Sequence, residues 1–165
     1  MKAEYIDKLR VMHKYVHWDE QLSEEENKGN GKKYFAAVDF LCESKEQGVL
    51  EALLDFFTSE NEQYGGVCEN LKAQIGANFS LEQIIEAFYK KFDSLAENDF
   101  GICAEMSMWC VRNEHGEQFR KMFNTVKSKH SKEIVKDLKA SASEYNWEED
   151  VKEAIDTLEG DMKNW

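Results

Sequence analysis

This chain contains no proline, and long apolar runs are missing as well. Strand proteins of this size usually place several prolines in their turns, whereas helices joined by short polar loops need none. No apolar stretch reaches the length that spans a bilayer. The N-terminal segment is amphipathic and acidic, so it lacks the apolar run of a secretory signal. These absences together predict a helical protein of the cytoplasm.

Sequence motifs for catalysis are also missing. There is no GxSxG, no P-loop and no glycine-rich phosphate cradle. The four cysteines have no CxxC spacing, and each falls within an apolar helical pattern, which predicts buried thiols rather than disulfides, a zinc site or a nucleophile. They are Cys42, Cys68, Cys103 and Cys110. We therefore expect no catalytic residues, no metal and no cofactor.

One histidine pair has a spacing known from metal ligands. His13 and His17 are four residues apart and would share one face of a helix. The sequence HKYVH, however, lacks the glutamate that a zinc-protease helix places beside its first histidine. The favoured interpretation is an amphipathic helix with two half-exposed histidines, and a metal-dependent enzyme that uses His13 and His17 is the alternative.

Apolar residues recur at helical spacing along the whole chain. With 165 residues and 42% apolar side chains, the protein has enough material for a core without disulfides. We predict one all-helical domain over residues 1–165, with an N-terminal helix within 1–22, a loop over 23–33 and helical pairs over 34–165. The loop is predicted from SEEENKGNGKK, where two glycines and Asn30 break the pattern. Ser44 with Gln47, and Ser80 with Gln83, have the spacing of capping boxes.

The helical pattern repeats with a period of about 35 residues. This shift superposes Val49, Leu50, Leu53 and Phe57 on Ile84, Ile85, Phe88 and Phe92. Such a period is typical of helical solenoids, because one helical pair cannot bury its apolar face alone. The sequence thus predicts an all-α, right-handed stack of antiparallel helix pairs, an α-α superhelix of the HEAT, armadillo or tetratricopeptide kind. An irregular helical bundle is the alternative.

Acidic side chains outnumber basic ones by 33 to 21, which gives a net charge of −12. The excess lies near the two ends, because residues 66–140 hold 11 side chains of each sign. Such a surface repels phosphate backbones and anionic membranes, so neither nucleic acid nor membrane is expected as a partner. It attracts a basic protein instead.

Candidate contact residues combine acids with exposed aromatics. In the last predicted helix the apolar residues occupy one face, and a row of acidic side chains occupies the face that is exposed to solvent. An acidic row is mildly destabilising, so retaining it is consistent with a docking surface, although a solvated capping helix is the alternative. The candidate contact residues are Trp18, Asp19, Glu20, Glu60, Glu62, Tyr64, Glu149, Asp150, Glu153 and Asp156.

In outline the chain resembles the immunity proteins of bacterial polymorphic-toxin systems, including contact-dependent growth inhibition, that have HEAT- or armadillo-like helical pairs. The resemblance rests on the repeat period, on the units SKEQGVLEALLDFF and FSLEQIIEAFYKKF, and on the acidic balance. It departs from typical HEAT units in having no repeat prolines.

This resemblance implies tight binding of one cognate toxin, often a nuclease, whose active site or substrate surface is blocked. An acidic protein suits that task, because nucleases are basic where they hold phosphates. The competing hypothesis is a helical-repeat adaptor or regulator that binds a peptide or protein in a concave groove.

Overall fold

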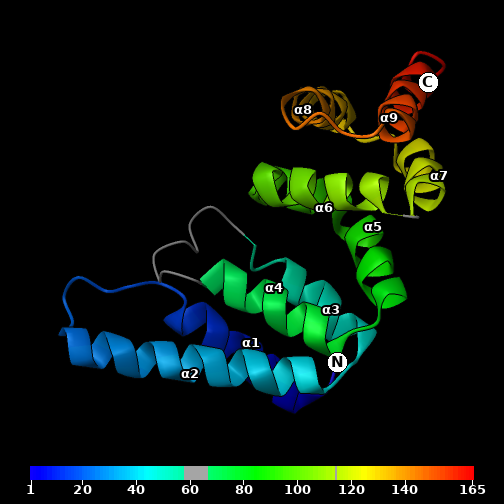
Figure 1. Ribbon diagram of the computed structural model, residues 1–165. Helices are drawn as coiled ribbons and strands as arrows, with labels where there is room; N and C mark the ends of the chain where they lie inside the picture. The colour runs from blue at the N-terminus through cyan, green and yellow to red at the C-terminus, as the bar shows by residue number, and fades with distance from the viewer. Residues whose placement is uncertain (58–66, 114) are drawn as a thin grey trace. The chain divides into compact units, whose positions relative to one another are not determined.

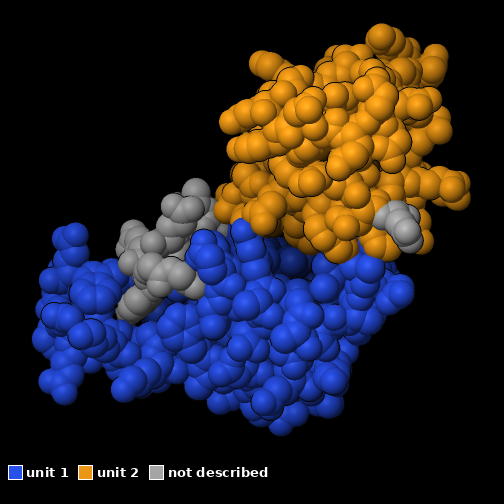
Figure 2. All heavy atoms as spheres, viewed as in Figure 1, with its two compact units in different colours: residues 1–91 blue, residues 92–165 orange. Residues whose placement is uncertain are grey.

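The computed structural model describes residues 1–57, 67–113 and 115–165. The described residues form nine α-helices and no strand, which confirms the predicted all-α class (Figure 1). Two compact units can be distinguished, Met1–Lys91 and Phe92–Trp165 (Figure 2). One domain over residues 1–165 therefore stays a prediction. None of the helices in the described ranges is both long enough and apolar enough to cross a membrane.

The described residues of the first unit form four complete helices and the start of a fifth. Helix α1 packs along α2, and α2 in turn contacts α3 and α4. The buried side chains of α2 recur every three or four residues, as expected for the inner face of an amphipathic helix. The helices are α1 (Ala3–Tyr15), α2 (Glu24–Glu43), α3 (Gln47–Leu54), α4 (Val67–Asn78) and α5 (Leu81–Asn98).

The predicted loop over residues 23–33 is wrong, because α2 begins at Glu24 and runs through it. Ser23 forms a capping box with Glu26, in which each side chain bonds the backbone of the other residue. Three glutamates in the first turn further favour the helix start. Each glycine inside a helix costs about 1 kcal/mol relative to alanine. That local cost is outweighed here, since Gly31 is buried in the packed face of α2.

The N-terminal helix is shorter than the range of residues 1–22 that was predicted for it, because α1 ends at Tyr15. A buried side chain of α2, Asn27, holds the turn that follows. Its amide nitrogen donates to the carbonyl of Asp19 at 2.8 Å, and its amide oxygen accepts from the backbone N–H of Asp19 at 3.0 Å. These bonds satisfy buried polar groups that would otherwise be unpaired, so the turn is fixed against α2.

One of the two predicted capping boxes is confirmed. Ser80 and Gln83 exchange backbone and side-chain hydrogen bonds at the start of α5. The Ser44–Gln47 box is wrong, because Glu46 occupies the N-cap position of α3 without a side-chain cap bond, and Gln47 donates to the carbonyl of Gln83 at 3.1 Å. The Gln83 side chain donates in return to the carbonyl of Lys45 at 3.1 Å. A tertiary contact between the starts of α3 and α5 has therefore replaced the local cap.

The second unit surrounds a cluster of phenylalanines. The ring of Phe92, from the second half of α5, lies 6.4 Å from those of Phe119 and Phe123, which are themselves 5.6 Å apart between centroids. All three are almost fully buried. Helix α6 contacts the three helices that follow it, and α9 contacts α7 and α8. These helices are α6 (Phe100–Arg112), α7 (Gly116–Val126), α8 (Ser131–Glu144) and α9 (Glu149–Met162).

Candidate functional site

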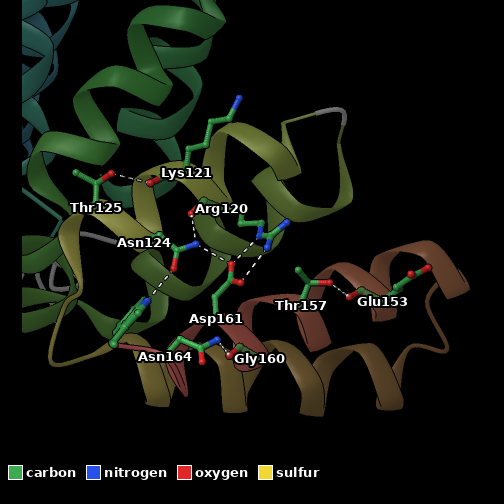
Figure 3. Close-up of polar contacts among 10 residues, drawn as sticks. Arg120, Lys121, Asn124, Thr125, Glu153, Thr157, Gly160, Asp161 and Asn164 are labelled. Carbon is green, nitrogen blue, oxygen red and sulfur yellow. Dashed lines mark hydrogen bonds and ion pairs between the residues drawn. The ribbon is translucent and has the colours of Figure 1, made fainter.

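The surface formed by α7 and α9 carries a network of polar side chains (Figure 3). Asp161 of α9 points between two side chains of α7. It accepts from Nε and Nη2 of Arg120, at 2.6 Å and 2.9 Å, and from the amide of Asn124 at 2.7 Å. The amide oxygen of Asn124 accepts from the indole N–H of Trp165 at 2.7 Å. The network therefore ties α9 and the residues after it to α7.

The titration of Asp161 reflects this arrangement. The Arg120 guanidinium and, secondarily, the Asn124 amide lower the pKa of Asp161 from 3.8 to about 2. The same pairing raises the pKa of Arg120 above its usual value. A bidentate guanidinium–carboxylate pair fixes orientation as well as distance, so it sets the position of α9 relative to α7.

Beside this network lies a groove of about 300 Å³ between α7, α9 and the end of α6. Its floor is apolar and includes Val111 and Leu158, which are 7% and 2% exposed. Its rim carries carboxylates from both α7 and α9. We call this the α7–α9 groove, lined by Val111, Gly116, Glu117, Arg120, Asp150, Glu153, Ala154, Thr157 and Leu158.

A second depression of about 600 Å³ shares Glu117 and Arg120 with the α7–α9 groove. Its additional charged residues are different, since Lys121 and Lys127 line it together with Asp161. Helices α7 and α9 thus carry two neighbouring hollows that differ in their charged residues. The hollow with carboxylates at its rim, the α7–α9 groove, contains residues that were predicted from the sequence as partner contacts.

Four predicted contact residues lie on α9, and all four are exposed. Asp150 and Glu153 line the α7–α9 groove and have no ion-pair partner among the described side chains. Glu149 lies 3.9 Å from Lys152. Asp156 is exposed but pairs with Lys139 of α8 at 2.9 Å. The same lysine binds Glu159 at 2.8 Å and lowers the pKa of that carboxyl. Asp150 and Glu153 are therefore the most available of the four.

The other described candidates form one turn of the first unit. Trp18 is 37% exposed, and Asp19 and Glu20 beside it are also exposed. The carboxylate of Asp19 accepts from the backbone N–H of Gln21 at 2.9 Å. The Asn27 bonds described above hold this turn in place. Glu60, Glu62 and Tyr64 lie outside the described residues.

The groups considered for catalysis are not arranged together. Burial raises the pKa of the Cys42, Cys103 and Cys110 thiols to about 12, and all four cysteines are buried and unpaired by disulfides, as predicted. His13 lies 4.4 Å from the Phe56 ring, between centroids. His17 follows the end of α1, so the two histidines do not share a helix face. The parts of the chain that the structure describes hold no cluster of three or more metal-ligating side chains.

The network of Arg120, Asn124, Asp161 and Trp165 was not predicted from the sequence. Arg120 and Asn124 are four residues apart, and this spacing places both on one face of α7, whereas Trp165 follows the end of α9. That Asp161 and Trp165 meet this face of α7 depends on tertiary packing, which the spacing does not reveal.

Comparison of the chain with protein-family models, with curated proteins and with solved structures finds no match, so the assignment of a function rests on the site itself.

Proposed function

We propose that this protein is an acidic protein-binding module that neutralises a cognate, basic nuclease toxin, in the manner of an immunity protein. The observation that carries the proposal is the pair Asp150 and Glu153, which border an apolar groove without an ion-pair partner among the described residues. Charges left unpaired at the edge of an apolar surface are available to a partner of opposite sign. The net charge of −12 adds long-range attraction for such a partner.

The anchoring of α9 supports this proposal. Asp161 lies on the same helix as Asp150 and Glu153 and is held by Arg120 and Asn124 of α7. The acidic face therefore belongs to a helix whose position is fixed. A rigid surface loses less conformational entropy when it binds. Inhibition by this surface requires only that it covers the phosphate-binding residues of the toxin, so no chemistry by the protein itself is needed.

We also propose that the helices form a right-handed stack of antiparallel pairs. In support, α3, α5 and α7 begin at Gln47, Leu81 and Gly116, which repeats the period seen in the sequence. The intervening α4, α6 and α8 alternate with them.

The test of function begins with capture of a partner by the immobilised full chain from a lysate of cells that carry its gene. Capture at about 50 mM NaCl and release at about 500 mM is expected, because screening weakens attraction between charged surfaces. The captured protein is then purified, and its cleavage of plasmid DNA is measured with and without an equimolar amount of the chain.

Inhibition of cleavage is the expected result. The double variant Asp150→Asn/Glu153→Gln should inhibit less well, whereas Asp137→Asn/Glu144→Gln on α8, which removes the same charge elsewhere, should inhibit like the natural protein. If the captured protein carries no nuclease activity, or if cleavage continues unchanged in the complex, the immunity proposal fails. A salt-insensitive partner would favour an adaptor instead.

A further inference from the structure

The α7–α9 groove has an apolar floor and an acidic rim, and a long basic side chain is complementary to both. Its floor is formed by the buried Val111 and Leu158 together with Ala154, so it favours an aliphatic segment. Its rim carries Glu117 from α7 and Asp150 and Glu153 from α9, so it favours a positive charge near solvent. Long basic side chains lay an aliphatic stem on an apolar surface while the charged end stays at the edge.

The charges already present in the groove do not neutralise its rim. Arg120 also lines the groove, but its guanidinium is held by Asp161 in a bidentate pair. Glu117 contacts Lys121 at 2.8 Å in an exposed pair, with side chains 80% and 74% exposed, and such pairs contribute little. Among the described residues, the carboxylate of Asp150 accepts from the neighbouring backbone N–H of Val151, at 3.0 Å. Glu153 has no ion pair within the described ranges.

We propose that the α7–α9 groove takes one arginine side chain of a basic protein partner. The carboxylates come from two helices on opposite sides of the groove, and a planar guanidinium with five N–H donors can bond to several of them at once, whereas an ammonium acts as a point charge. The groove volume of about 300 Å³ is at the small end of the range for ligand sites, which suits a single side chain. The inference rests on the proposed function, and it names the residue type that anchors the partner.

The test uses the tripeptide Ac-Gly-Arg-Gly-NH₂ as a probe and the full chain labelled with ¹⁵N. The backbone amides of Gly116, Glu117 and Thr157 should shift and saturate as the peptide is added. The matched peptide with citrulline, which has nearly the same shape and no charge, should leave them unmoved. A lysine peptide should bind more weakly. Equal binding of the lysine and arginine peptides would overturn the assignment to arginine.

Two variants separate the groove from general acidity. Ala154→Leu fills the floor without changing any charge, and Asp150→Asn/Glu153→Gln removes rim charge without changing shape. Each should weaken arginine-peptide binding about fivefold or more. Asp137→Asn/Glu144→Gln should bind like the natural chain, and the thermal unfolding of each variant shows whether it is folded.

The groove proposal would be overturned if the peptide shifted backbone amides near many acidic sites. It would also be overturned if the α8 control variant lost as much peptide binding as the groove variants. This outcome is distinct from failure of the proposed function, because the peptide titration needs no toxin and the plasmid-cleavage assay needs no peptide. If the chain inhibits a nuclease but does not bind the arginine peptide, the proposed function stands and the proposal of an arginine site in the groove fails.

Discussion

At the scale of single residues, a few polar side chains determine local structure that propensity alone would not give. Asn27 is fully buried, and both ends of its amide bond to the backbone around Asp19. Lys127 adopts a left-handed conformation with φ of 47° directly after α7. Each of these residues can be tested by one substitution.

Replacing Asn27 with alanine should lower the free energy of unfolding by about 2 kcal/mol, because the backbone N–H and carbonyl of Asp19 lose their buried partners. Urea unfolding followed by far-UV circular dichroism measures the change. Asn30→Ala on the same helix is the control and should change stability by less than about 0.5 kcal/mol. Equal effects of the two substitutions would contradict the role assigned to Asn27.

Replacing Lys127 with glycine should raise stability by about 0.5 kcal/mol, because a left-handed conformation is disfavoured for residues with a Cβ and costs glycine nothing. The matched control is Lys136→Gly in the middle of α8, which removes the same charge but should lower stability by about 1 kcal/mol. Thermal unfolding of the two variants should therefore move in opposite directions. A lower melting temperature for Lys127→Gly would disagree with the strain inferred here.

At the scale of secondary-structure elements, the contact between α7 and α9 depends on one carboxylate. Asp161 binds Arg120 and Asn124 of α7, and its side chain is 20% exposed. The two helices also pack against each other, and Leu158 of α9 and Phe119 of α7 are buried. The electrostatic part of this contact is therefore open to titration.

Asp161→Asn should lower stability at neutral pH by about 1 kcal/mol, near the upper end for an exposed pair. The pKa of Asp161 is about 2 in the folded protein, below its ordinary value of 3.8. A lowered folded pKa stabilises the protein above the unfolded pKa, and this stabilisation is lost as the pH falls through the folded pKa. The difference between the natural protein and the variant should therefore shrink between about pH 4 and pH 2.

Urea unfolding at a series of pH values measures that difference, and Asp137→Asn serves as the control carboxylate. A gap between natural protein and Asp161→Asn that stays constant down to pH 2 would show that the Arg120 contact does not hold the carboxylate charged.

At the scale of the whole molecule, the charge imbalance is the dominant property. Because 33 acids face only 21 bases, at least 12 acids remain unpaired even if every base forms one pair. Many of the observed pairs are also exposed contacts between neighbours on one helix, such as Lys28 with Glu24 and Lys90 with Glu86. Repulsion among the remaining acids is thus an intrinsic property of the folded chain.

Added salt should therefore stabilise the protein. Raising NaCl from about 10 mM to about 300 mM shortens the screening length and should raise the free energy of unfolding by roughly 0.5 kcal/mol. The midpoint of urea unfolding at neutral pH measures the change, and KCl should act in the same way as NaCl. A midpoint that falls with salt would mean that attraction within ion pairs outweighs repulsion.

The sequence was sufficient to predict the helical class and the buried faces, because periodic apolar positions directly specify which side of a helix is buried. It predicted the cap of Ser80 correctly, and it missed the cap of Ser23 because the glycines at 29 and 31 suggested a loop. The rim acids Asp150 and Glu153 were predicted from their helix face. Their groove was not, since its floor joins Val111 of α6 to Leu158 of α9, and such tertiary proximity leaves no trace in local spacing.

Helix α5 runs without interruption through Lys91 and Phe92, where the two compact units divide. Cutting the chain there would leave backbone carbonyls exposed at the end of one fragment and amide hydrogens exposed at the start of the other, because a helical hydrogen bond joins residues four apart. The second fragment would begin at Phe92, whose ring lies in the phenylalanine cluster. Truncation at this point is thus expected to yield frayed halves, and a separable fragment would need to retain the helix from Leu81 onward.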